Sequence, residues 1–186
     1  MASLLSFLFL FSFCFFINIR AVFLGQSHIY LPTERLQKFS HLHFYSHDIL
    51  DTKNPTSVKI INPTSSDNNS PNAFGTTHMV DNPLTEEQDP SSKLIGRAQG
   101  TYALASKNGF GLKMDINFVF IDGIYKGSTL SMLGRNAIMN SVREMPIVGG
   151  TGAFRFARGF ALAKTVWYNS TSGNAIEEFN VTVCHF

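Results

Sequence analysis

The segment Leu112–Ile121 constrains the fold most, because its side chains alternate between the two sides of an extended chain. Every second residue is apolar and belongs to one face, namely Leu112, Met114, Ile116, Phe118 and Phe120. Most of the residues between them are polar or charged. A period of two is typical of a β-strand with one face buried. The chain must therefore fold around an interior that one face of a sheet encloses.

Shorter runs of the same kind recur along the chain. We expect further strands at residues 42–50, 56–61, 74–81, 94–106, 125–133, 154–168 and 176–186. The third run is expected to stop at Asn82-Pro83, because proline cannot donate to a ladder, and residues 134–144 are expected to form a longer crossing. No amphipathic helix of useful length is present. Since about eight strands must cover their edges, we predict an all-β fold, a single eight-stranded antiparallel β-barrel that can hold one small ligand.

The composition and the N-terminal segment limit the class of protein to which the chain can belong. The 186 residues suit one domain, and the net charge of +2, without a run of basic residues, argues against nucleic acid as a partner. Leu4–Ile17 is apolar but short for a membrane span, so we expect residues 1–25 to be a secretory signal peptide. Residues 26–40 are expected to form an exposed arm, and residues 41–186 the barrel domain.

Removal of the signal would place the protein in the extracellular space, with no membrane anchor. Three sequons, at Asn68, Asn169 and Asn180, are candidate glycosylation sites. Asn169 is the best of them, because it lies in an expected turn. Pro71 follows the Asn68 sequon directly and disfavours its use.

A glycine-rich stretch, Arg143–Gly159, contains Gly149, Gly150 and Gly152 between two apolar runs. Such a stretch could cradle a phosphate, but the spacing matches neither a dinucleotide-binding fingerprint nor a Walker loop. The residues that follow favour a strand over a helix. We therefore expect a tight turn between two strands.

Four blocks, in order along the chain, carry a family resemblance: Phe44–Asp48, Gly96–Tyr102, Asn117–Asn136 and Arg143–Gly159. Together they resemble plant dirigent proteins over roughly residues 42–186. The resemblance implies an antiparallel eight-stranded barrel that assembles as a homo-oligomer, a dimer or trimer, and binds phenolic molecules in its pocket.

Asp48 is the polar residue that the strand pattern itself singles out. It lies on the same face of its strand as Leu42 and Phe44. It could cap a turn at the strand end, or it could place a carboxyl group inside a cavity. The resemblance favours the second possibility.

The resemblance also implies that Tyr102 and Thr165 bind the substrate and that Asp48 and Arg143 are catalytic residues. A neutral Asp48 could protonate a quinone methide carbonyl oxygen, and Arg143 could stabilise the charge on that oxygen or hold Asp48 ionised. Arg143 could alternatively pair with an acidic residue in a loop. Asn136 stands where lignan-forming members tend to have Asp, so it can bind a substrate but cannot protonate it.

These residues and the resemblance leave three functions open, and the first is the one that we predict. The first is a dirigent protein that guides the coupling of monolignol radicals, such as those of coniferyl alcohol, supplied by a separate laccase- or peroxidase-type oxidase. The second is an enzyme that closes a ring on a quinone methide, as pterocarpan synthases do. The third is a non-catalytic barrel that carries phenolic molecules. No cofactor or metal site is expected, because His41, His43 and His47 are too far apart along a strand to converge.

Overall fold

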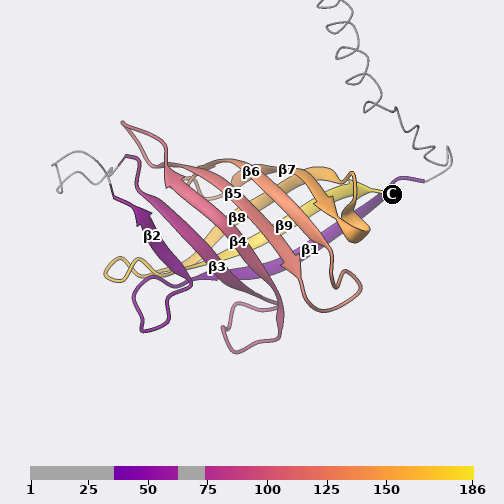
Figure 1. The fold of residues 1–186 in the computed structure, drawn as a ribbon, viewed down its shortest axis with the longest axis horizontal. Coiled ribbons are helices and arrows are strands. Elements are labelled where there is room, and N and C mark those ends of the chain that lie inside the picture. The colour runs from indigo at the N-terminus through magenta and orange to yellow at the C-terminus, as the bar shows by residue number, and fades with distance from the viewer. Residues whose placement is uncertain (1–35, 63–73) are drawn as a thin grey trace, which may run out of the picture. The chain divides into compact units, whose positions relative to one another are not determined.

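The computed structural model describes residues 36–62 and 74–186, and these residues form a β-barrel (Figure 1). The predicted signal peptide (1–25), most of the predicted arm and the Asn68 sequon lie outside the described residues. The strands are β1 (Lys38–Asp48), β2 (Ser57–Ile61), β3 (Thr77–Thr85), β4 (Leu94–Leu104), β5 (Gly111–Phe120), β6 (Thr129–Ala137), β7 (Arg143–Thr151), β8 (Arg158–Tyr168) and β9 (Ala175–His185). A short 3₁₀ helix, η1 (Gly152–Phe154), lies between β7 and β8.

Eight of these strands close into a ring, which confirms the predicted antiparallel barrel. The strand order is β1-β9-β8-β7-β6-β5-β4-β3, and β3 pairs back to β1 at Tyr45↔Thr85 and Ser46↔Leu84. The remaining strand, β2, lies beside the first half of β3, with Ser57 opposite Val80. Closure leaves the ring without a free sheet edge, which is how a barrel avoids edge-to-edge association.

The interior is divided into a packed half and a hollow half. Phe44, Phe118 and Phe179 form an aromatic cluster with ring centroids 5.0–5.7 Å apart. All five apolar residues of the alternating segment Leu112–Ile121 point inward, as predicted. Burial of each large apolar side chain contributes about 1.5–3 kcal/mol, so this half of the barrel holds the wall in shape around the cavity.

The glycine pattern was predicted only in part, because Gly149 and Gly150, which were expected in the turn, lie within β7, a strand that was not among those expected. Two other features are present as predicted. Gly152 has φ +63° and begins the turn from β7 to β8. Gly100 on β4 lies so close to β5 that a Cβ atom would sit 1.9 Å from the Asp115 carbonyl oxygen. The register of β3 against β4 shifts beside Gly96, which is the bulge that this segment was expected to contain.

The prediction that β3 stops at Asn82-Pro83 is wrong, because the strand continues to Thr85. Along one edge, β3 pairs with β2 as far as Val80 and with β1 from Leu84. Pro83 lies between these two ladders, so its missing N–H removes no bond from them.

The strand expected at residues 125–133 was also placed too early. A turn that contains Gly123 and Gly127, both with positive φ, delays β6 until Thr129. β6 then continues to Ala137 and β7 begins at Arg143, so within the expected crossing at 134–144 only residues 138–142 lie between strands. The predicted arm (26–40) likewise ends within β1, since Lys38 already pairs with His185 of β9.

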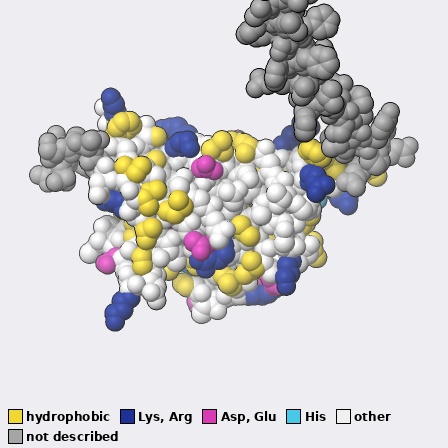
Figure 2. Space-filling view, in the orientation of Figure 1, with side chains coloured by type: hydrophobic (Ala, Val, Ile, Leu, Met, Phe, Trp, Pro, Cys, Tyr) yellow, Lys and Arg dark blue, Asp and Glu magenta, His cyan; other side chains and the backbone are white. Residues whose placement is uncertain are grey.

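The outer surface carries no concentrated charge on the side that Figure 2 shows. Lysine and arginine side chains lie apart from one another there, with hydrophobic and acidic side chains between them. Within residues 36–62 and 74–186, no helix is long and apolar enough to cross a membrane.

Candidate functional site

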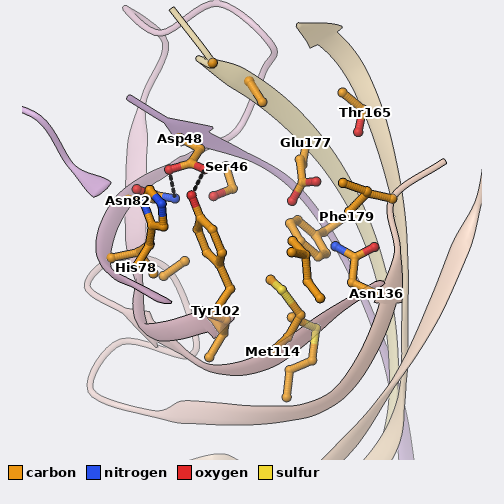
Figure 3. Close-up of a pocket in the computed structure, with 18 of the residues that line it drawn as sticks. Ser46, Asp48, His78, Asn82, Tyr102, Met114, Asn136, Thr165, Glu177 and Phe179 are labelled. Carbon is orange, nitrogen blue, oxygen red and sulfur yellow. Dashed lines mark hydrogen bonds between the residues drawn. The ribbon is translucent and has the colours of Figure 1, made fainter. Parts of the chain in front are cut away.

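A cavity of about 570 Å³ occupies the hollow half of the barrel. Its floor includes Phe118 and Phe179 of the aromatic cluster, and its walls are mostly hydrocarbon, among them Leu112, Met114 and Met132. This volume suits a small organic molecule of the size that protein pockets commonly bury. A few polar side chains converge on it from different strands (Figure 3).

Asp48 lies at the end of β1 and points into the cavity (Figure 3). Its carboxyl oxygens accept hydrogen bonds from Asn82 Nδ2 at 3.3 Å and from the Tyr102 hydroxyl at 3.2 Å. Burial raises the pKa of Asp48 above its ordinary value of 3.8, and these hydrogen bonds oppose the rise. Among the described residues, no lysine or arginine forms an ion pair with Asp48. The environment therefore makes this carboxyl group a weaker acid than an exposed aspartate.

Tyr102 connects Asp48 to a second group of polar side chains. Its hydroxyl lies 3.1 Å from Ser57 Oγ, and its ring stacks on His78 with centroids 4.8 Å apart. Burial raises the pKa of Tyr102, and the nearby carboxylate of Asp48 adds to the effect. Burial also lowers the pKa of His78, so both rings stay neutral around pH 7.

Arg143 begins β7 and lies in the wall behind the cavity, with only 3% of its surface exposed. All three of its nitrogens donate hydrogen bonds. Nε binds Asn136 Oδ1 at 3.1 Å, Nη1 binds Thr165 Oγ1 at 2.9 Å, and Nη2 binds Glu177 Oε1 at 2.7 Å. The guanidinium therefore fixes three side chains that line the cavity, and it does not line the cavity itself.

Glu177 lies on β9 opposite Ser46 of β1, so it faces the same interior as Asp48 two residues further along β1. Its side chain is 21% exposed and lines the cavity. Burial raises the pKa of Glu177, the Arg143 guanidinium opposes this rise, and the charge of Asp48 adds to it. The cavity thus contains two carboxyl groups, of which only Glu177 has a cationic partner.

The structure brings the five predicted site residues together. Asp48, Tyr102, Asn136 and Thr165 line the cavity, and Arg143 touches Asn136 and Thr165 from behind. Two hypotheses for Arg143 are wrong: it pairs neither with Asp48 nor with a loop carboxylate, because its partner is Glu177. The predicted glycosylation residues Asn169 and Asn180 are both exposed, in the turn after β8 and on the outer face of β9.

Sequence reasoning did not find Glu177, His78, Asn82 or Ser57. A signal for Glu177 was available, because Phe179, Val181 and Val183 share its parity on the last strand and all three are buried. That pattern places Glu177 on the inward face. The other three residues lie on β2 and β3, whose short or irregular patterns do not show which face is buried.

Comparison with known proteins decides the family. A family model described as dirigent-like protein matches residues 39–184. The chain belongs to the dirigent family. It is 53% identical to Dirigent protein 23 of Arabidopsis thaliana over 148 residues, which cover 80% of this chain and 79% of that protein.

Two further relatives bear on the chemistry of this dirigent barrel. Pterocarpan synthase 1 of Glycyrrhiza echinata is 48% identical over 151 residues, covering 81% of this chain and 80% of that protein. The solved structure of the pterocarpan synthase dirigent protein GePTS1 superimposes with a TM-score of 0.76 at 47% identity, covering 83% of this chain and 88% of that one. The barrel around the cavity is therefore a dirigent barrel in sequence and in fold.

Proposed function

We propose that this dirigent protein is a cyclase that closes a ring on a quinone methide made from a phenolic benzylic alcohol, without an oxidant. The observation that carries the proposal is Asp48, a carboxyl group in an apolar cavity with no cationic partner among the described residues. A carboxyl group whose pKa is raised by burial retains its proton more readily and can act as a general acid.

In the proposed reaction, Asp48 donates its proton to the benzylic hydroxyl, the C–O bond breaks and water leaves. The para hydroxyl of the same ring loses its proton to solvent, and the quinone methide results. A second phenolic hydroxyl of the molecule then adds to the methide carbon and loses its proton. The ring carbonyl oxygen takes up a proton from water and Asp48 regains its proton from solvent, so the net change is the loss of one water molecule.

Binding in the cavity would supply the stereochemistry. Walls that hold the substrate in one orientation present one face of the methide carbon to the attacking hydroxyl. Asn136 and Thr165 are held in place by Arg143, and with Tyr102 they can orient phenolic hydroxyls. The similarity to proteins named pterocarpan synthase supports this assignment.

A second candidate is stereoselective coupling of monolignol radicals, with the radicals supplied by a separate laccase- or peroxidase-type oxidase. The observation that favours it is the hydrocarbon lining of the cavity of about 570 Å³, which includes Phe110, Leu112 and Ile138 and suits aromatic rings. In that reaction, Asp48 would protonate the carbonyl oxygen of the quinone methide that coupling creates.

Product analysis on a chiral column separates the candidates. The cyclase should convert an isoflavanol with a free phenol to one enantiomer of the ring-closed product, with no oxidase present. The coupling candidate requires that coniferyl alcohol and a one-electron oxidase give an enantiomeric excess that the oxidase alone does not give. If neither substrate reacts stereoselectively but both bind, the barrel is a carrier and the cyclase proposal is wrong.

We also propose that the protein is secreted to the apoplast, as the N-terminal segment predicts, and that it forms a homo-oligomer. Exposed apolar side chains on the outer face of neighbouring strands, among them Leu133, Val148 and Phe160, support the second proposal. Light scattering of the purified protein would report its mass in solution. A monomer at micromolar concentration would contradict an oligomer.

A further inference from the structure

Glu177 is a second carboxyl group in the cavity, and no step of the proposed reaction has used it. It reaches the interior from β9, on the wall next to β1, and its carboxyl group points into the space between the aromatic floor and Asp48 (Figure 3). The neighbouring Glu178 points to the outer face instead, where it binds His43 at 2.8 Å. Because successive residues of a strand face opposite sides of the sheet, Glu177 faces the interior and Glu178 faces the outside.

Arg143 is not placed to contact a substrate. Its Nε, Nη1 and Nη2 each donate a hydrogen bond, to Asn136, Thr165 and Glu177, and its side chain is 2% exposed. The guanidinium is not among the groups that line the cavity, so these three side chains lie between it and a bound molecule. Any effect of Arg143 on the reaction must therefore pass through the side chains that it holds.

The ion pair also distinguishes the two carboxyl groups. A cation at 2.7 Å favours the ionised form of Glu177, whereas Asp48 has only neutral partners. The geometry therefore favours Asp48 over Glu177 as the carboxyl group that carries a proton. One cavity then presents a proton donor and a proton acceptor to the same bound molecule, as an acid–base pair requires.

We infer that Glu177 is the catalytic base that takes the proton from the attacking phenolic hydroxyl during ring closure, and that Arg143 is a positioning residue which acts through it. The inference rests on the proposed cyclase function. A lone pair of the phenolic oxygen forms the C–O bond to the methide carbon; the O–H bond breaks, its electron pair stays on that oxygen, and the proton moves to the Glu177 carboxylate. The methide electrons return to the ring carbonyl oxygen, so no oxidant or reductant is needed.

The test follows an isoflavanol in water enriched in oxygen-18. A quinone methide that fails to close is captured by water, so label enters the benzylic position and reports methide formation separately from ring closure. In Glu177→Gln, ring closure should fall about 100-fold or more, the usual contribution of a general base, while methide formation continues and label accumulates. Asp48→Asn should lose both ring closure and label.

Glu178→Gln is the matched control, because it removes the same carboxylate from the outer face of the same strand. It should keep the wild-type ratio of ring closure to label. Arg143→Gln should shift this ratio in the same direction as Glu177→Gln, which a loss of structure alone would not do. If Glu177→Gln does not fold, Glu177→Asp is used instead, because its shorter side chain keeps the negative charge but moves it away from the bound molecule. The ratio of ring closure to label in this variant should also fall below that of the wild type.

A wild-type ratio in the folded Glu177 variant would overturn the inference and leave the cyclase function standing. If the wild-type protein itself neither closes the ring nor incorporates label, the cyclase function and this inference fall together. Loss of label as well as ring closure in Glu177→Gln would place Glu177 in methide formation and would also contradict the proposed role.

Discussion

The buried ion pair between Arg143 and Glu177 predicts a strong energetic coupling between two strands. Arg143→Met leaves the Glu177 carboxylate without its cation and removes the donors to Asn136 and Thr165. Glu177→Met leaves a guanidinium that is 2% exposed without its anion. Loss of one partner of a buried pair costs about 3–5 kcal/mol, so each single substitution should destabilise the barrel by about that amount.

The double substitution should cost less than either single one. It removes both charges, and what remains is the loss of a donor at Asn136 and at Thr165. A hydrogen bond of this kind contributes about 0.5–1.5 kcal/mol, so the double variant should lose about 1–3 kcal/mol. The coupling energy in the double-mutant cycle should therefore reach about 3 kcal/mol or more.

Urea unfolding at pH 7 measures the four free energies of unfolding, and thermal unfolding provides a check, since 1 kcal/mol shifts Tm by about 2–4 °C in a domain of this size. The pair Glu178→Met and His43→Met is the control, because that exposed contact should couple by less than about 1 kcal/mol. Costs for Arg143 and Glu177 that add to within about 0.5 kcal/mol would refute the ion pair as an energetic unit.

Three further predictions follow from other parts of the molecule. Burial raises the pKa of Asp48 in the folded protein, so the stability that the protonated carboxyl group contributes at low pH is lost as the pH rises through its folded pKa. Urea unfolding should therefore show that Asp48→Asn gains stability relative to the wild type between pH 4 and pH 7. A difference that stays constant with pH would count against a buried carboxyl group. Gly100→Ala should destabilise by about 1–3 kcal/mol or more, because its Cβ would meet β5 backbone, whereas Gly149→Ala, with no atom within 4 Å, should stay within about 0.5 kcal/mol. Mass spectrometry of the protein from plant apoplast should find a chain that lacks the signal segment and carries glycan on Asn169; an intact N-terminus or a bare Asn169 would contradict secretion through the glycosylation pathway.

Much of the barrel could be predicted from the sequence, because a period of two marks which side of a strand is buried. The segment Leu112–Ile121 shows this pattern without interruption, and the structure follows it residue by residue. Where the pattern is interrupted, prediction failed. Pro83 indicated a strand end, but its local chemistry cannot show that the neighbouring strands β1 and β2 leave that edge unpaired.

The site shows the same limit more sharply. Family resemblance pointed to Asp48 and Arg143, but it could not say which acid Arg143 binds, since that depends on the registers of β7 with β8 and of β8 with β9. Two adjacent glutamates, Glu177 and Glu178, have different partners because one faces in and the other faces out. A partner that lies 34 residues away in the sequence is fixed by the pairing of these strands, not by any local motif.

Direct titration of the Asp48 carboxyl tests the central claim, that the cavity holds a neutral acid ready to donate a proton. In carbon-13 NMR of protein labelled at aspartate, the side-chain resonance that disappears in Asp48→Asn belongs to this group. The account predicts that this resonance titrates above the ordinary value of 3.8, because burial outweighs the hydrogen bonds from Asn82 and Tyr102. A titration at or below 3.8 would show an ionised Asp48 throughout the working range, and it would contradict the assignment of Asp48 as the acid.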